Sequence, residues 1–364
     1  MSEMEKTKVL HIVGALNLGG AETMIMNIFR NIDRSRFQFD FYLSGNSGGF
    51  YEEEVLLLGG RIINVGRRKK HPVKYSIELF KLIRKEKYDA IQIHGTDAMD
   101  GLPAFVSWLA GAKKICLFSH NTRGQSMWRQ KIMRAMFMPF VTHPQACSDM
   151  AAEWMFGKRA NKAKIIPLPI NCDLCVYDQE FREKERLRLG LTGKKVVGHI
   201  GRFQTQKNHE QLIDIFAELI KKDSGYRLVL IGVGNLEESI RKKVKNLEIE
   251  EYVLFMGQVD KACRMLSIFD VFLLPSLYEG FPTVLLEAQA NGLEAVTSSA
   301  ITPSIALTDL VHFVDLDDSA SHWADQLIEY TSERHDTEKF NMLIAKDYSA
   351  PSVAAKFSNI YLGD

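Results

Sequence analysis

The chain has 364 residues, of which 46% are hydrophobic and 25% charged, and its formal net charge is +1. At about 150 residues per domain this length predicts two to three domains, and the composition excludes disordered, collagen-like and coiled-coil proteins. The first residues are partly acidic and the apolar run after them ends at Gly14, so no signal peptide is expected. Since no stretch approaches the ~18 apolar residues of a membrane-spanning helix, we expect a cytoplasmic protein.

Short β-branched runs alternate with amphipathic stretches in the first half. The runs predict strands at 8–14, 37–43, 61–65, 90–94, 114–118 and 164–168, and apolar spacings of three and four residues predict helices at 21–32, 76–87 and 130–138. Such alternation predicts a parallel sheet covered on both faces.

The alternation pauses at 167–190, where prolines and a dense run of charges indicate a linker, and then resumes. Strands are predicted at 195–201, 226–232, 253–257, 271–275, 294–298 and 311–314. A helix at 209–222 is expected to begin with a capping box between Asn208 and Gln211. We therefore expect α/β domains at 1–170 and 195–345, a linker at 171–194, and a final segment at 346–364 whose helix packs toward the first domain.

Charge and cysteine placement give weaker indications. Residues 1–170 contain 25 Lys+Arg against 15 Asp+Glu, or +10, and the remainder contains 21 against 30, or −9. Basic clusters at 67–70, 84–87 and 123–134 suit an anionic membrane surface or a solvated face equally well, while nucleic acid is disfavoured because no aromatic residues interleave. The close pair Cys172 and Cys175 is more typical of two linker thiols than of a zinc or redox site.

Ligands of parallel α/β sheets lie beyond the carboxyl ends of the strands, which directs attention to the loops. Gly19 and Gly20 follow the first strand and permit close backbone approach, although a bare turn explains them as well and the dehydrogenase fingerprint is missing. Arg202 and Lys207 lie in the loop before a helix and could converge on a diphosphate; two solvated cations are the alternative.

The stretch 275–287 is the most informative in the chain. Glu279 and Gly280 form a turn, Pro282 suits the first position of a helix, and Glu287 stands on an otherwise apolar helix. A buried carboxylate needs donors, which the two adjacent hydroxyls of a ribose or an internal Arg or Lys could supply. In the first half, His94 and His120 close predicted strands and could contact a sugar hydroxyl or a leaving phosphate, or be structural.

Together these motifs resemble the retaining glycosyltransferases of the GT-B class in family four, often labelled glycosyl transferases group 1. The resemblance includes the GGAE turn at 19–22, SHN at 119–121, GRF with KN at 201–208, IGVGN at 231–235, FMGQV at 255–259, and two glutamates eight positions apart at 279 and 287. It implies two Rossmann-like doubly wound domains facing each other across a cleft, a nucleotide-sugar co-substrate bound mainly by the second domain, and no metal or other cofactor.

The resemblance also implies roles for individual residues. Glu287 would hold the donor ribose, Arg202 and Lys207 the diphosphate, and Glu279 the sugar hydroxyls. Catalytic roles are expected for Glu279, His120, Arg202 and Lys207, and His120 would lie beside the donor sugar. Further donor contacts are expected from Gly19, Gly20, Gly232, Val259, Gly280, Phe281, Thr283 and Val284.

The second half is similar to transferases of bacterial capsular and exopolysaccharide assembly. This likeness implies a UDP-sugar donor, a glycan or polyprenyl-linked acceptor, and peripheral contact of the basic half with the inner membrane face. Cys172 and Glu294 depart from the family pattern, which usually has Gly and Pro there. A sugar-nucleotide 2-epimerase and a non-catalytic nucleotide-sugar-binding subunit stay open as alternatives.

Overall fold

A computed structural model describes residues 5–17, 19–45, 48–66, 68, 70–122, 127–331 and 334–363. The chain forms two compact units, one made of Met1–Ile170 with Tyr348–Asp364 and the other of Asn171–Asp347. Residues 171–194 therefore belong to the second unit, and the last helix belongs to the first. Of the predicted basic clusters, Arg67, Lys69 and Arg123 lie outside the described residues.

The first unit is built on a sheet of seven parallel strands in the order β3-β2-β1-β4-β5-β6-β7. The strands are β1 (Thr7–Val13), β2 (Phe37–Leu43), β3 (Arg61–Asn64), β4 (Ala90–Gly95), β5 (Ile115–Ser119), β6 (His143–Ala146) and β7 (Lys164–Ile165). Its helices are α1 (Gly20–Asn31), α2 (Glu52–Leu57), α3 (Pro72–Glu86), α4 (Leu102–Leu109), α5 (Met127–Phe137), α6 (Asp149–Phe156) and α13 (Ala350–Leu362).

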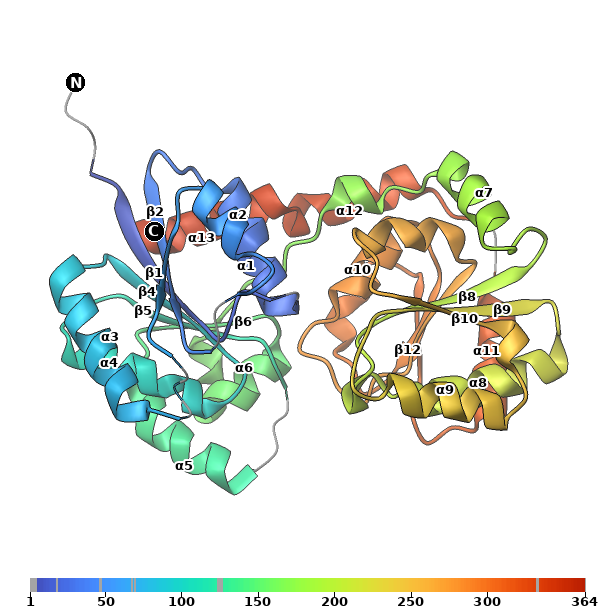
Figure 1. Cartoon of the computed structure of the whole chain (residues 1–364), viewed down its shortest axis with the longest axis horizontal. Helices are drawn as coiled ribbons and strands as arrows, with labels where there is room; N and C mark the ends of the chain where they lie inside the picture. Colours follow the sequence, from blue (N-terminus) through green and yellow to red (C-terminus); the bar gives the residue numbers. More distant parts are fainter. Residues whose placement is uncertain are drawn as a thin grey trace. The chain divides into compact units, whose positions relative to one another are not determined.

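Helix α13 joins the first unit from the far end of the sequence. Figure 1 shows it, in red, beside the blue α1 and β2, and its residues Val353, Phe357 and Tyr361 are buried. Lys114 anchors the end of the helix, because its Nζ donates to the carbonyls of Ile360 at 2.9 Å and Tyr361 at 2.8 Å. The first unit is thus completed by the last residues of the chain.

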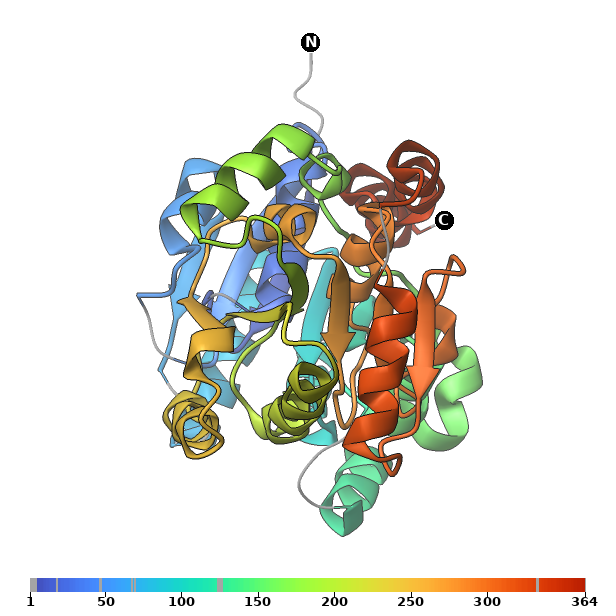
Figure 2. The same ribbon diagram turned by 90° about the vertical axis from the view of Figure 1, so that its right-hand side faces the viewer.

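The second unit is built on six parallel strands in the order β10-β9-β8-β11-β12-β13. The strands are β8 (Lys195–Ile200), β9 (Tyr226–Ile231), β10 (Val253–Gly257), β11 (Val271–Leu274), β12 (Ala295–Ser298) and β13 (Val311–Val314). The helices are α7 (Gln179–Arg188), α8 (His209–Lys222), α9 (Glu237–Asn246), α10 (Thr283–Ala290), α11 (Ala320–Tyr330) and α12 (Thr337–Tyr348). Figure 2 turns this unit toward the viewer.

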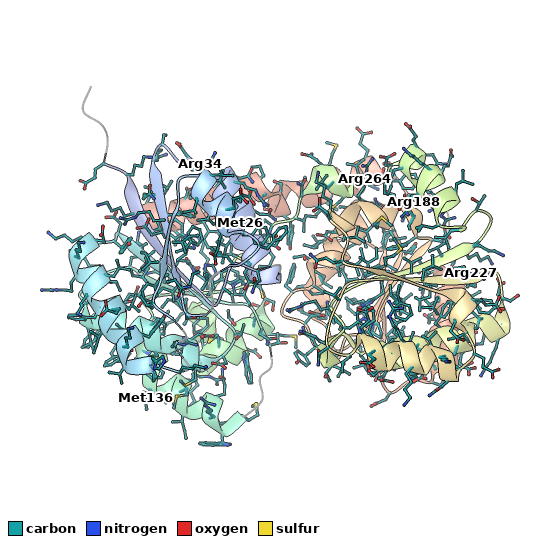
Figure 3. All side chains as sticks on the ribbon, viewed as in Figure 1. Met26, Arg34, Met136, Arg188, Arg227 and Arg264 are labelled. Atoms are coloured by element: carbon teal, nitrogen blue, oxygen red, sulfur yellow. The ribbon has the colours of Figure 1, made fainter. Side chains whose placement is uncertain are left out.

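Each unit has its own hydrophobic core, and side chains fill the space between sheet and helices in both (Figure 3). In the second unit the core includes Phe216 of α8, Leu228 of β9 and Trp323 of α11, none of them exposed. Both units are Rossmann-like, as the strand–helix alternation predicts. Among the described helices, none has the length and apolar character that crossing a bilayer requires.

The main differences between the structure and the predicted elements lie at four places. The predicted strand 164–168 ends at Ile165, and β6 lies at 143–146, where no strand is predicted. The charged part of the predicted linker forms α7. The capping box is wrong: Asn208 adopts a left-handed conformation with φ 55°, and its Nδ2 donates to the side chain of Gln211 rather than capping the backbone.

Candidate active site

The carboxyl edge of the second sheet is a set of loops held together by backbone hydrogen bonds. The amide of Gly201, after β8, donates to Ile231 at 2.9 Å, and the amide of Gly232, after β9, donates to Gly257 at 2.8 Å. The amide of Leu277, after β11, donates to Gln206 at 2.9 Å. Because these bonds join the loops to one another, the side chains on them are held in place before any ligand binds.

Gly232 is required by this arrangement. Its φ is 142°, and a Cβ there would lie 2.1 Å from the carbonyl oxygen of Gly201. Glycine is therefore needed at this position because it lets the backbones of the loops after β8 and β9 approach each other closely. Val259, one of the expected donor contacts, follows β10 on the next loop and is half-buried.

Lys207 and Glu279 come together although 72 positions separate them. Lys207 Nζ lies 2.7 Å from Glu279 Oε1, and Gln206 Nε2 donates to Glu279 Oε2 at 2.9 Å. Glu279 is only 7% exposed, so the cation offsets the cost of burying its charge. Gln206 is a site residue that the sequence analysis missed, since only the fold shows which side chains meet Glu279.

Arg202 shares the loop after β8 with Lys207. Its side chain is exposed and has no ion pair or hydrogen bond with the residues that the structure describes. The structure does not bring it to Lys207 through a shared partner. Arg202 keeps its five N–H donors available for an anionic ligand.

Glu287 lies on α10 and is half-buried, and its carboxylate has no ion pair or hydrogen bond with the described residues. Burial raises the pKa of this carboxyl to about 7. The alternative left open by the sequence, in which Glu287 pairs with an internal Arg or Lys, is therefore not found in the described part of the chain. The side chain is an unused hydrogen-bond acceptor at a position that α10 fixes.

The start of α10 is uncapped by any side chain. Pro282 is the N-cap residue rather than the first helical residue, because its ψ of 91° is extended, and the helix begins at Thr283. The backbone N–H groups of Thr283 and Val284, the first two residues of the helix, have no intrahelical acceptor and favour an anion. Gly280 and Phe281, just before the helix, are buried.

His199 is a further residue that the sequence analysis did not single out. It ends the buried part of β8, where its Nδ1 lies 2.8 Å from the carbonyl oxygen of Leu273. A Cβ on Gly201 would come within 2.8 Å of His199 Nε2 and 3.3 Å of the Lys207 side chain. The histidine thus packs directly beneath the loop that bears Arg202 and Lys207.

Three histidines on neighbouring strands of the first unit form a hydrogen-bonded chain. His11 Nδ1 lies 3.2 Å from His94 Nε2, and His94 Nδ1 lies 3.1 Å from His120 Nε2. Burial lowers the pKa of His11 to about 3 and that of His120 to about 4, and lowers that of His94 well below its ordinary value. All three rings are therefore neutral near pH 7.

Gly19 and Gly20 lie where the sequence places them, between β1 and α1. Gly19 is the N-cap residue of α1, and Gly20 is its first residue. A Cβ on Gly20 would meet nothing within 4 Å, whereas one on Gly19 would meet only the flexible side chain of Glu22. Internal packing therefore does not explain Gly20, which leaves the start of α1 open for close approach of a ligand.

A cavity of about 620 Å³ lies at the opposite, amino-terminal edge of the second sheet. Arg182 and Arg186 of α7 both pair with Asp270, which precedes β11. Arg182 and Arg334 also donate to carbonyls at 266–269. Arg182 and Arg186 thereby hold α7 against the sheet.

One departure from the family pattern has a local explanation. Glu294 accepts from His312 at 2.7 Å and from His335 at 2.8 Å, so a carboxylate there joins two segments of the second unit. Over the described residues, no group of three or more His, Cys, Asp or Glu side chains has a geometry that could hold a metal ion.

Comparison with known proteins agrees with this architecture. Residues 181–346 match the family model described as glycosyl transferases group 1, and residues 18–174 match the model described as glycosyltransferase family 4. The Bacillus subtilis protein EpsF, named as a glycosyltransferase, is 31% identical over 97% of this chain and 96% of its own length. An Escherichia coli enzyme named UDP-Gal:alpha-D-GlcNAc-diphosphoundecaprenol alpha-1,3-galactosyltransferase is 24% identical over 82% of this chain and 81% of its own.

Solved structures show the same fold. Anabaena HepE in complex with UDP and glucose superposes with a TM-score of 0.79 over 98% of this chain and 100% of that chain, at 17% identity. The two Rossmann-like units are thus those of the GT-B fold. The match to both family models and the near full-length similarity to EpsF show that this chain is a glycosyltransferase of family 4, the group 1 glycosyltransferases.

Proposed function

We propose that this glycosyltransferase moves a sugar, with retention of anomeric configuration and without a metal, from a UDP-sugar to a glycan or polyprenyl-linked acceptor in cell-surface polysaccharide biosynthesis. The choice of UDP is supported by the E. coli relative, whose name gives UDP-Gal as donor, and by HepE, solved with UDP and glucose. The lipid-linked acceptor is supported by the diphosphoundecaprenol in the name of that same relative.

The environment of Glu287 is the observation that most supports the proposed donor site. A half-buried carboxylate without a partner among the described residues costs free energy in the free protein, which two donating ribose hydroxyls would offset. Arg202, Lys207 and the uncapped start of α10 supply the positive charge and the N–H groups that a diphosphate requires. In this assignment Glu279 holds the sugar hydroxyls, and His120, Gly19 and Gly20 are the donor contacts of the first unit.

The proposed reaction is attack on the same face from which the leaving group departs. The bond between the anomeric carbon and the diphosphate oxygen breaks, and the acceptor oxygen bonds to that carbon on the same face. The acceptor's proton passes to the departing diphosphate oxygen. Arg202 and Lys207 stabilise the negative charge that develops on the diphosphate.

Calorimetric titration with UDP, GDP and ADP, each with and without EDTA, tests this proposal. We expect UDP to bind more tightly than the other two nucleotides, EDTA to leave the affinity unchanged, and Glu287→Ala to weaken UDP binding by about 100-fold, since a bidentate charged contact is lost. If no nucleotide bound the wild-type protein, or if EDTA abolished binding, the proposed donor chemistry would be wrong.

We also propose that the first unit contacts an anionic membrane surface, and helix α5 supports this contact. Trp128, Ile132 and Met136 recur at four-residue steps and are 70%, 47% and 51% exposed. Arg129 and Lys131 on the same helix are exposed as well. Exposed apolar residues together with cations on one helix suit the interface of an anionic bilayer.

Flotation with lipid vesicles measures this contact. We expect the protein to bind phosphatidylglycerol vesicles better than phosphatidylcholine vesicles, and the double variant Trp128→Ser, Ile132→Ser to bind the former at least about 10-fold more weakly. Leu187→Ser is the matched control, because Leu187 is 74% exposed but lies on α7 of the second unit. Equal binding of both variants would rule out α5 as the contact.

A further inference from the structure

The three hydrogen-bonded histidines of the first unit differ in burial from one end of the chain to the other. His11, His94 and His120 belong to β1, β4 and to the residue just after β5, three neighbours in the sheet. His11 is fully buried between aromatic rings, with Phe39 at a centroid distance of 4.3 Å and Phe41 at 5.4 Å. His120, at the other end, is only half-buried.

Neutral rings constrain the direction of these hydrogen bonds. A neutral imidazole has one N–H donor and one lone-pair acceptor. His94 contacts a ring through each of its nitrogens, so it donates through one and accepts through the other. Both hydrogen bonds must therefore point the same way, either toward His120 or toward His11.

The buried end of the chain decides between the two directions. His11 Nε2 is buried and has no hydrogen-bond partner in the described part of the structure. If the bonds pointed toward His11, this nitrogen would bear an N–H buried without an acceptor. If they point toward His120, it bears only a lone pair, and an orphaned acceptor is tolerated better than an orphaned N–H.

We propose that His11 and His94 are positioning residues that fix the tautomer of His120, with the proton of each of the three rings on Nδ1. His11 Nδ1 then donates to His94, His94 Nδ1 donates to His120 Nε2, and His120 Nδ1 presents an N–H. No described residue is hydrogen-bonded to His120 Nδ1. In the proposed function, on which this step depends, the N–H of His120 meets an oxygen of the donor sugar. His120 then acts as a hydrogen-bond donor and not as a base.

The tautomers can be read directly by long-range ¹⁵N–¹H NMR of the ligand-free protein labelled in its 10 histidines. Single-histidine variants assign the signals. We expect His11, His94 and His120 to show the Nδ1–H form at pH 7. An Nε2–H signal from His120 would overturn the proposal, and because no ligand is present, this result is independent of whether UDP binds.

Two substitutions of His11 separate positioning from packing. His11→Phe removes the donor, and His11→Asn keeps an N–H donor near the position of Nδ1. We expect His11→Phe to mix the tautomers of His94 and His120 and to lower kcat at least 10-fold at unchanged UDP affinity, and His11→Asn to restore most of kcat. Equal kcat for the two variants at equal thermal stability, or an unchanged His120 spectrum in His11→Phe, would refute the proposal.

Cys116→Ala is the control for loss of buried volume. Cys116 is fully buried on β5, in the same sheet, and makes no contact with the three histidine rings among the interactions described. We expect this variant to lose stability while its histidine spectrum and its kcat stay those of the wild type.

Discussion

Replacing Lys207 with alanine is expected to lower kcat by about 10²–10³-fold, the usual effect of removing one preorganised group that stabilises transition-state charge. The substitution removes a cation from the proposed diphosphate site and also leaves Glu279, 2.7 Å away and 7% exposed, without its ion-pair partner. The measurement is UDP release at saturating donor and acceptor.

Two further lysine variants make this experiment specific. Lys222→Ala, on α8, removes a lysine that pairs with the exposed Asp325 and is expected to retain wild-type kcat. Lys207→Arg keeps the charge and is expected to recover part of the loss. Full turnover of a correctly folded Lys207→Ala protein would show that the charge at this position does not act on the leaving diphosphate.

Glu287→Gln is expected to make the free protein more stable while disabling its donor site. Burial raises the pKa of this carboxyl from 4.5 to about 7, so the folded chain binds the proton more tightly than the unfolded chain. The cost of the buried charge therefore grows as the pH rises from 4.5 to 7 and is fully present above 7. Since one pKa unit corresponds to about 1.4 kcal/mol, glutamine should stabilise the protein by about 1–3 kcal/mol at pH 8.

Thermal unfolding and UDP titration across pH test both halves of this prediction. The melting temperature of Glu287→Gln should exceed that of the wild type at pH 8 and match it near pH 4.5. UDP affinity of the wild type should fall as the pH is lowered from 8 to 6, because protonation removes the acceptor, and the weaker affinity of the variant should not change over this range. Equal UDP affinity of both proteins at pH 8 would remove Glu287 from the ribose site.

The strands of the second half could be predicted to within a residue or two, because each is a compact apolar run bounded by glycine, proline or charged residues. Strand β6 could not, since its four residues include a proline and two polar side chains. Helix α7 could not be predicted either, for a different reason. Most of its residues are charged, and it is held by arginines that reach Asp270, more than 80 positions away.

The functional site likewise has features that follow from local sequence and features that follow only from the fold. Its loops follow from the rule that ligands lie at the carboxyl ends of parallel strands, and the positions of Arg202 and Lys207 after β8 and of Glu279 after β11 agree with that rule. The contact of Lys207 with Glu279 joins two different loops, and the histidine chain joins three strands. Such pairings depend on strand order and side-chain direction, which a single sequence does not contain.

The packing of α13 on the first unit affects how the chain must fold during synthesis. The second unit, Asn171–Asp347, is continuous in sequence and can close as soon as it leaves the ribosome. The first unit is made earlier, but it cannot be completed until α13 has been synthesised. Until then, the surface that will cover Val353, Phe357 and Tyr361 is exposed to solvent. The first unit is therefore completed last during translation, and a chain released early would expose apolar surface in the half that was synthesised first.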